Sequence, residues 1–313
     1  MELLEKAKAG NKPSIARLIS IVEEGTPESA AVLREIYLET GGARLIGVTG
    51  PPGSGKSTLT DKLVKACRNK GKTVGVIAVD PTSPFTGGAI LGDRIRMSGI
   101  ALDEGVFIRS MGTRGSLGGV SKATHNAIKV LDYAGFDYIF IETVGVGQSE
   151  IDIVKTADSV IVVSVPGLGD DVQASKAGIL EIGDIFVVNK SDRDGAERVV
   201  IELAQMLDLN PNKDIGWKPP IIKTVASRGD GVDELNDKVN EHYDYLLESD
   251  EITERRKIRL ANEVMEVLMK HAETYVHSRL EEEEFTSKKL DKILSRELNP
   301  YDVVDEILEK TFK

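Results

Sequence analysis

The most regular feature of the chain is a series of short apolar runs that begins near Ala43. Five of them are rich in β-branched residues: ARLIGVT, TVGVIAV, DYIFIE, SVIVVSV and DIFVVN. Helical sequence separates these runs along the chain. Strands that are apolar on both faces are typical of parallel sheets covered by helices on both sides. The alternation therefore predicts an α/β fold with a doubly wound, mostly parallel sheet.

Helical sequence flanks this β-rich region on both sides. Residues 1–42 are predicted to form an N-terminal helical extension made of a pair of helices, and Thr26 caps the second of them, which has Pro27 at its first position. The β signal ends after Leu235, and the remainder of the chain is helical in pattern. We therefore predict one domain over residues 43–247 and a C-terminal helical arm over residues 248–313.

Within the predicted arm, apolar residues alternate at spacings of three and four. Such a heptad-like seam either packs against its own domain or contacts a second copy of the chain in a dimer. Both interpretations are open from the sequence, and a dimerisation arm is the prediction carried forward. The seam consists of Ile258, Ala261, Met265, Leu268, Ala272 and Tyr275.

Composition excludes several classes of protein. The chain has 313 residues, 41% of them hydrophobic and 29% charged, and a formal net charge of −11 that disfavours nucleic-acid binding. One cysteine, Cys67, allows no internal disulfide, and the four histidines are scattered along the chain rather than clustered as metal ligands. No apolar run approaches membrane-spanning length, and the first residues lack a signal core. We expect a cytoplasmic protein that contacts neither nucleic acid nor membrane.

A glycine-rich turn after the first strand-like run carries the strongest chemical signal. The segment GVTGPPGSGKST contains the pattern GxxxxGK[ST] between a predicted strand and a predicted helix. In such a P-loop, backbone amides and the helix N-terminus bind phosphate oxygens, the lysine contacts the β- and γ-phosphates, and the serine hydroxyl binds Mg²⁺. The predicted phosphate-binding residues are Gly50, Pro51, Pro52, Gly53, Ser54, Gly55, Lys56, Ser57 and Thr58.

A second motif, NKSD, predicts which base the site selects. Asn189, Lys190 and Asp192 follow a predicted strand and match the NKxD pattern of guanine sites. A carboxylate at Asp192 can accept two hydrogen bonds from guanine, whereas adenine has no matching pair of donors. A later loop, Val225–Ala226–Ser227, is predicted to close over the base with the Ala226 N–H directed at the guanine carbonyl. GTP and GDP are therefore the predicted ligands.

Acidic residues near predicted strand ends suggest a Mg²⁺ site beside the P-loop. Asp80 and Glu142 end two strand-like runs, and Asp93 lies between them in the segment GGAILGDRIRM. Carboxylates at the carboxyl ends of such strands face the nucleotide crevice and can hold Mg²⁺ directly or through water. The sequence leaves open which acid binds the metal. The Gly-rich segment from Phe107, with Arg109, Arg114 and Gly115, is either a phosphate-sensing loop or a mobile connection.

The turn ETVGVGQSE bears on the rate of hydrolysis. Gly145 is predicted to contact the γ-phosphate through its N–H, and Val146 follows where better-known GTPases carry a glutamine that orients the attacking water. Valine cannot orient water, so we predict slow intrinsic hydrolysis, with Gln148 as the candidate substitute within the chain. The residues predicted to take part in hydrolysis are Lys56, Asp93, Glu142, Gly145 and Gln148.

The chain resembles the methylmalonyl-CoA mutase-associated GTPases, the MeaB/ArgK/MMAA group of the metallochaperone class. The resemblance covers nearly the whole chain and rests on GPPGSGKST, VDPTSPFTGGAILGDRIRM, FIRSMGTRGSLGGVS, ETVGVGQSE and PGLGDDVQASKAGILEIGDIFVVNKSD. It implies a homodimeric GTPase that assists a cobalamin-dependent acyl-CoA mutase in cofactor loading and protection, with hydrolysis stimulated by the mutase. Residues near Gly169 to Lys176 resemble an additional switch that signals to this partner.

Two other functions compete with this one. A nickel-delivery GTPase would normally need Cys and His ligands near its switches, and only Cys67 and dispersed histidines are available. A small-molecule kinase would use the P-loop but would rarely carry an NKxD motif. Nickel binding, hydrolysis without a partner and co-purification with a mutase would discriminate among the three.

Overall fold

The computed structural model describes residues 2–80, 99–112, 121–143, 152–167, 183–209, 216–282 and 286–311. The chain divides into two compact units, Met1–Arg255 and Arg256–Lys313. The finer division after residues 42 and 247 stays a prediction. Among the described residues, no helix combines the length and the apolar character that a membrane crossing requires.

The first unit is built on one sheet in which every described strand pairs in parallel, as the apolar runs predicted. The strand order is β3-β2-β4-β1-β5-β6-β7. All five predicted runs are strands, and β3 and β7 are added at the two edges. The strands are β1 (Arg44–Thr49), β2 (Val74–Asp80), β3 (Val106–Gly112), β4 (Tyr138–Glu142), β5 (Ser159–Ser164), β6 (Ile185–Asn189) and β7 (Ile221–Thr224).

Strand β3 corrects the interpretation of the segment that begins at Phe107. Arg109 lies within this edge strand, opposite Ile77 of β2, and not in a loop. Its guanidinium forms a 2.9 Å ion pair with Glu23 of the N-terminal extension. The polar residues in the middle of the run hid the strand, because an edge strand is not buried on all sides. Arg114 and Gly115 lie outside the described residues.

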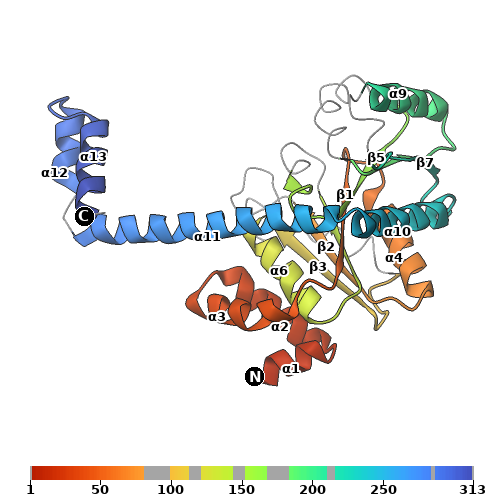
Figure 1. Cartoon of the computed structure of the whole chain (residues 1–313), viewed down its shortest axis with the longest axis horizontal. Coiled ribbons are helices and arrows are strands. Elements are labelled where there is room, and N and C mark those ends of the chain that lie inside the picture. Colours follow the sequence, from red (N-terminus) through yellow and green to blue (C-terminus); the bar gives the residue numbers. More distant parts are fainter. Residues whose placement is uncertain are drawn as a thin grey trace. The chain divides into compact units, whose positions relative to one another are not determined.

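Helices cover both faces of the sheet and enclose two apolar clusters (Figure 1). On one face, α4 packs against α10; on the other, α6 packs against the strands and against α2 of the N-terminal extension. The described helices that lie wholly in this unit are α1 (Glu2–Lys8), α2 (Lys12–Glu24), α3 (Pro27–Ile36), the 3-10 turn η1 (Tyr37–Glu39), α4 (Lys56–Asn69), α6 (Lys122–Tyr133), α9 (Ala196–Asp208) and α10 (Val232–Glu248).

The N-terminal extension contains three described α-helices where the sequence predicted a pair. The predicted cap at Thr26 is present: Thr26 and Ser29 form a reciprocal capping box, and Pro27 is the first helical residue. Buried Ile15, Leu18 and Ile19 place one face of α2 in the main apolar cluster. The extension is therefore part of the core of the first unit.

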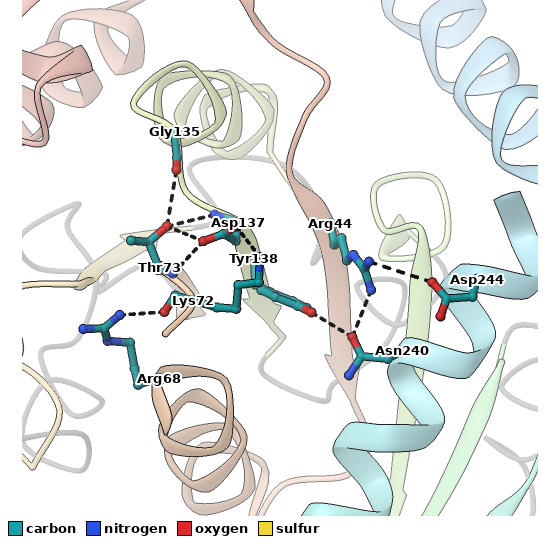
Figure 2. Close-up of polar contacts among 9 residues, drawn as sticks. All are labelled: Arg44, Arg68, Lys72, Thr73, Gly135, Asp137, Tyr138, Asn240 and Asp244. Atoms are coloured by element: carbon teal, nitrogen blue, oxygen red, sulfur yellow. Dashed lines mark hydrogen bonds and ion pairs between the residues drawn. The ribbon is translucent and has the colours of Figure 1, made fainter. Parts of the chain in front are cut away.

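Polar contacts fix the amino-terminal ends of the central strands (Figure 2). At β1, the Arg44 guanidinium donates to Asn240 Oδ1 at 2.9 Å, and the Tyr138 hydroxyl of β4 donates to the same oxygen at 2.7 Å. The Asp137 carboxylate accepts hydrogen bonds from the backbone and hydroxyl of Thr73. This edge of the sheet is opposite the carboxyl-terminal edge that carries the predicted nucleotide residues.

A buried polar group lies where α11 (Glu251–Glu282) begins. Arg255 donates to both carboxylate oxygens of Asp184, which precedes β6, at 2.9 and 3.1 Å. His242 of α10 is fully buried, with Nδ1 2.7 Å from Ser159 Oγ and Nε2 3.4 Å from Asp184 Oδ1. Burial lowers the pKa of His242 below its usual value.

The second unit comprises the rest of α11 with α12 (Thr286–Leu294) and α13 (Pro300–Thr311). Lys289 and Glu306 form a 2.6 Å ion pair between α12 and α13. The apolar seam predicted on α11 is exposed: the exposed fractions are 63% for Ile258, 57% for Met265 and 58% for Leu268. Dimerisation through this seam stays a prediction.

Candidate functional site

The P-loop occupies the turn between β1 and α4, as predicted. Gly50 has φ 138°, and a Cβ there would lie 2.2 Å from the carbonyl oxygen of Val163 on β5. Gly55 has φ 91°, and a Cβ there would lie 2.4 Å from Asn189 Nδ2. Both positions therefore require glycine for conformation and for space. The loop delivers the chain to the N-terminus of α4, where backbone amides point outward without intrahelical partners.

Lys56 is the first residue of α4 and is buried by the loop that it follows. Its ammonium donates to the carbonyl oxygens of Gly50 at 2.8 Å and Pro51 at 3.1 Å. These contacts hold the positive charge across the interior of the loop. Ser54 is fully buried in the same turn, and its hydroxyl has no hydrogen-bond partner among the described residues. A buried cation, outward amides and a spare hydroxyl together suit a polyanionic ligand such as a phosphate chain.

Ser57 and Glu142 bring two oxygen ligands together beside the P-loop. The Ser57 hydroxyl donates a 2.5 Å hydrogen bond to Glu142 Oε1, and both residues are buried. Glu142 ends β4, the neighbour of β1 in the sheet. Hard oxygen ligands of this kind fit Mg²⁺. Among the described residues, no group of three Cys, His, Asp or Glu side chains is arranged to hold a metal ion unaided.

The other predicted acids contribute less to this geometry. Asp80 is the last residue of β2, whose Ala78 pairs with Glu142, so its backbone lies at the same edge of the sheet. Asp93, Gly145 and Gln148 lie outside the described residues, as does Val146. Of the three acids that the sequence left open, Glu142 is the one whose carboxylate is seen beside Ser57.

The NKSD motif meets the P-loop through the side chain of Asn189. Its Nδ2 donates to the carbonyl oxygen of Ser54 at 2.8 Å. Its Oδ1 accepts from the Thr224 hydroxyl at 3.1 Å and from the Ala226 N–H at 3.0 Å. One buried amide therefore joins the phosphate-binding loop, the end of β6 and the loop after β7.

This network differs from the role predicted for Ala226. The sequence predicted that the Ala226 N–H would be directed at a guanine carbonyl, whereas here it donates to Asn189 Oδ1. Val225 and Ala226 are buried, and Ser227 is exposed beyond them. The loop does lie beside the NKSD motif as predicted, but its first backbone donor is used to hold the site together.

Lys190 and Asp192 are the other two residues of the NKSD motif that the sequence assigned to the base. Lys190 has φ 56°, a conformation uncommon outside glycine, and its ammonium donates to the Gly53 carbonyl oxygen at 2.6 Å. Its aliphatic stem thereby spans from the NKSD turn to the P-loop. The exposed Asp192 carboxylate lies 3.5 Å from the Arg228 guanidinium. An apolar stem and an exposed carboxylate are suited to covering a base and accepting hydrogen bonds from it.

Sequence reasoning missed the threonines that support this edge and the arginine at Asp192. Thr143 follows β4 and donates its hydroxyl to Thr49 at the end of β1, at 2.9 Å. Thr224 ends β7 and bonds to Asn189. The signal that could have identified both is a threonine at the end of a buried strand. Arg228 carries no motif signal and is recognised from its contacts.

The family model described as "Methylmalonyl Co-A mutase-associated GTPase MeaB" matches residues 15–282. The chain belongs to this family. The match covers most of the N-terminal extension, the seven described strands and α11, so the family resemblance read from the motifs is confirmed. Members are P-loop GTPases, which agrees with the loop, the NKSD motif and the sheet described above.

Several relatives support the family assignment. A Pyrococcus horikoshii protein described as a candidate GTPase is 54% identical over 311 residues, 99% of this chain and 97% of its own length. The mouse protein named methylmalonic aciduria type A homolog, mitochondrial, is 35% identical over 97% of this chain and 77% of its length. GTPase ArgK of Escherichia coli is 36% identical over 75% of this chain and 73% of its length.

A solved structure confirms the fold along the whole chain. The crystal structure of a protein titled LAO/AO transport system kinase has a TM-score of 0.72, with 23% identity, over 100% of this chain and 97% of the other. At this level of identity the comparison shows a shared fold alone. The transport and kinase activities in that title remain statements about that protein.

Proposed function

We propose that this MeaB-family protein binds GTP and GDP with Mg²⁺ and hydrolyses GTP to GDP and phosphate. The observation that carries the proposal is the buried Asn189 amide, which bonds to both the P-loop and the loop after β7. A phosphate-binding turn and a base-selecting motif held by one side chain favour a single ligand that spans both. A nucleotide with guanine as its base meets that requirement.

The roles of the individual residues follow from their positions. Lys56 would exchange its carbonyl partners for the β- and γ-phosphate oxygens, and the amides at the start of α4 would bind the same phosphates. Asp192 would accept hydrogen bonds from the ring N–H and the 2-amino group of guanine, while the Lys190 stem covers the base. Discrimination against adenine arises because adenine would leave this carboxylate without donors.

Ser57 and Glu142 are the residues that would hold Mg²⁺, with Asp80 and Asp93 as further acids on that side. Bound there, the ion would neutralise charge on the β- and γ-phosphate oxygens. Glu142 accepts the Ser57 hydrogen bond, and this contact holds the two oxygen atoms that would bind the ion next to each other. We treat it as the acid that matters most for metal affinity.

Intrinsic hydrolysis is proposed to be slow and to need a partner. Val146 cannot orient a water molecule, and the Gly145 amide would sense the γ-phosphate. Gln148 is the candidate within the chain for placing the water. These three assignments rest on the sequence alone, because the residues lie outside the described part of the chain.

The partner we propose is a cobalamin-dependent acyl-CoA mutase, whose cofactor loading and protection the GTPase cycle would assist. The family description names methylmalonyl-CoA mutase, and the name of the mouse relative refers to methylmalonic aciduria. We further propose a homodimer formed through α11, whose apolar seam is exposed, and a cytoplasmic location. The proposal includes no nucleic-acid or membrane partner.

Nickel delivery is disfavoured by the environment of Cys67. This thiol is buried in α4, lies 3.5 Å from Asn236 Oδ1, and has its pKa raised by burial to about 11. A thiol of that kind is a poor metal ligand at neutral pH, because metals bind the thiolate. Within the described residues, the site shows no feature that favours a kinase, and we assign no group as a phosphate acceptor.

The decisive experiment measures GTP turnover by the purified protein with and without candidate cobalamin-dependent mutases. We expect slow turnover alone and a marked increase with the correct mutase, and we expect GDP to bind much more tightly than ADP. Equal binding of ADP and GDP would overturn the nucleotide assignment. Stimulation by none of the mutases would overturn the proposed partner and leave the GTPase assignment intact.

A further inference from the structure

Arg228 is the side chain that contacts Asp192 within the described part of the chain. One guanidinium nitrogen, Nη1, lies 3.5 Å from Asp192 Oδ2, and Nε donates to Asp230 Oδ2 at 2.8 Å. The same guanidinium therefore bridges the NKSD turn and the loop after β7. Its two acidic neighbours raise the pKa of Arg228, with Asp230 contributing most.

The backbone of the loop fixes where Arg228 can lie. Its N–H donates to the Val225 carbonyl oxygen at 2.9 Å, and the Val225 N–H donates to the Asp230 carbonyl oxygen at 3.0 Å. Gly231, with φ 74°, closes the loop so tightly that a Cβ would lie 2.2 Å from the Lys223 carbonyl oxygen. A tight, internally bonded loop presents the arginine from a fixed position.

The contact leaves Asp192 able to bind a base. An ionised carboxylate offers about four lone-pair positions on its two oxygens. Guanine would use two of them, one for its ring N–H and one for its 2-amino group. A single Arg228 nitrogen at Oδ2 can therefore remain in place while the base binds.

Val225, at the start of the same loop, has a hydrocarbon side chain that cannot donate a hydrogen bond to Asp192. Asp192 is exposed and would rotate freely about its side-chain bonds without a partner. An arginine anchored by Asp230 supplies the donor that valine lacks.

We propose that Arg228 is a positioning residue for base specificity: bridged to Asp230, it orients the Asp192 carboxylate toward the two donors on the Watson–Crick edge of guanine. This inference rests on the proposed binding of guanine nucleotides. It adds a residue that no motif identifies, and it assigns Asp230 the role of anchoring that residue.

The test compares GDP with inosine diphosphate, which lacks only the 2-amino group of the base. In Arg228→Ala, we expect GDP binding to weaken about two- to fivefold, the range of an exposed ion pair. Binding of inosine diphosphate should weaken less, because it uses one fewer hydrogen bond to Asp192. The ratio of the two dissociation constants, measured by titration calorimetry, should therefore fall toward one.

Three further variants separate positioning from a merely structural role. Asp230→Asn should reproduce part of the loss by releasing Arg228, and Arg228→Lys should retain part of the specificity. Adding Arg228→Ala to Asp192→Asn should have little further effect, because no carboxylate remains to be oriented. The matched control is Arg198→Ala, which removes an exposed arginine paired with Glu202 on α9 and should leave both dissociation constants unchanged.

The outcomes are distinguishable from failure of the proposed function. If the unaltered protein does not prefer GDP to ADP, the proposed function fails and takes this inference with it. If it prefers GDP but Arg228→Ala weakens GDP and inosine diphosphate equally, or tightens GDP binding, only the positioning role is overturned. The positioning role would also be overturned if Arg228→Ala weakened GDP binding by the same factor in the Asp192→Asn protein as in the parent protein.

Discussion

The Asn189 side chain lies 2.8 Å from the carbonyl oxygen of Ser54, although the two residues are separated by most of the first unit's sequence. The contact requires Gly55, because a side chain there would collide with the Asn189 amide. Motifs that are read separately in the sequence thus form one structure at the carboxyl-terminal edge of the sheet.

Replacing Asn189 with alanine should weaken GDP binding about 10- to 100-fold. The substitution removes three buried hydrogen bonds and leaves their partners on Ser54, Thr224 and Ala226 unsatisfied, at about 1 kcal/mol or more each. Both phosphate and base contacts should suffer, since both loops lose their support. Fluorescence titration with labelled GDP would measure the change.

Asn240→Ala is the matched control for this prediction. Asn240 also carries a bonded amide, but it pairs with Arg44 and Tyr138 at the opposite edge of the sheet (Figure 2). The Asn240→Ala substitution should lower the free energy of unfolding without changing the affinity of the folded protein for GDP. Comparable losses of affinity in the two variants would contradict the special role of Asn189.

Glu142→Gln should separate metal binding from nucleotide binding. Glutamine preserves the shape of the side chain but removes the charge beside the Ser57 hydroxyl. We expect the tightening of GDP binding by Mg²⁺, and the GTP turnover rate, to fall about 10- to 100-fold. GDP binding without Mg²⁺ should change little, because the P-loop amides and Lys56 remain.

Titrations with and without Mg²⁺ would test this prediction. Glu23→Gln is the control, since Glu23 is a partly buried acid on the N-terminal extension and pairs with Arg109 of β3, away from the P-loop. A Glu142→Gln protein that keeps its full response to Mg²⁺ would direct attention to Asp80 and Asp93 instead.

The sequence was sufficient for the central strands and for the motif residues, because each rests on a local pattern. Continuous apolar runs predicted β1, β2, β4, β5 and β6, and the loop between β1 and α4 followed from its glycines. The edge strand β3 was missed because Arg109 interrupts its apolar pattern. Arg109 forms an ion pair with Glu23, a residue far away in the sequence, so no local pattern reveals this contact. The bonds of Asn189 and Arg228 are likewise long-range, and only the folded chain brings their partners together.

Leu268→Glu should disrupt self-association if α11 forms the proposed dimer. Leu268 is 58% exposed in the chain and lies in the seam with Met265 and Tyr275. A carboxylate there would have to be buried, without a partner, between two apolar faces. Light scattering coupled to gel filtration should show the mass of one chain where the parent shows that of two.

Lys270→Glu is the control for the seam, because Lys270 is exposed and lies on the opposite side of the heptad pattern. It should leave the mass unchanged. A parent protein with the mass of one chain would contradict the proposed dimer. If the Leu268→Glu variant still had the mass of two chains, the dimer interface would have to be formed by other residues.

His242 should make the first unit less stable below neutral pH. Burial is the largest cause that lowers the pKa of this histidine, and the positive charge of Arg255 lowers it further. The nearby carboxylates of Asp184, Glu251 and Asp158 act in the opposite direction. Because the unfolded chain takes up a proton near the ordinary pKa of 6.5 and the folded chain does so only at lower pH, protonation favours unfolding. The contribution of neutral His242 is thus complete above about pH 6.5 and is lost as the pH falls toward the folded-state pKa.

Urea unfolding at a series of pH values from about 7.5 down to about 5 would reveal this dependence, with a slope of at most about 1.4 kcal/mol per pH unit for one proton. His242→Asn keeps a polar group near Ser159 but cannot titrate, so its stability should depend less on pH over the same range, whatever its absolute value. His271→Asn, at an exposed position on α11, should keep the slope of the parent. If His242→Asn also kept that slope, the loss of stability would originate in other groups, and the buried contact between α10, β5 and β6 would be a structural feature without a role in the response to pH.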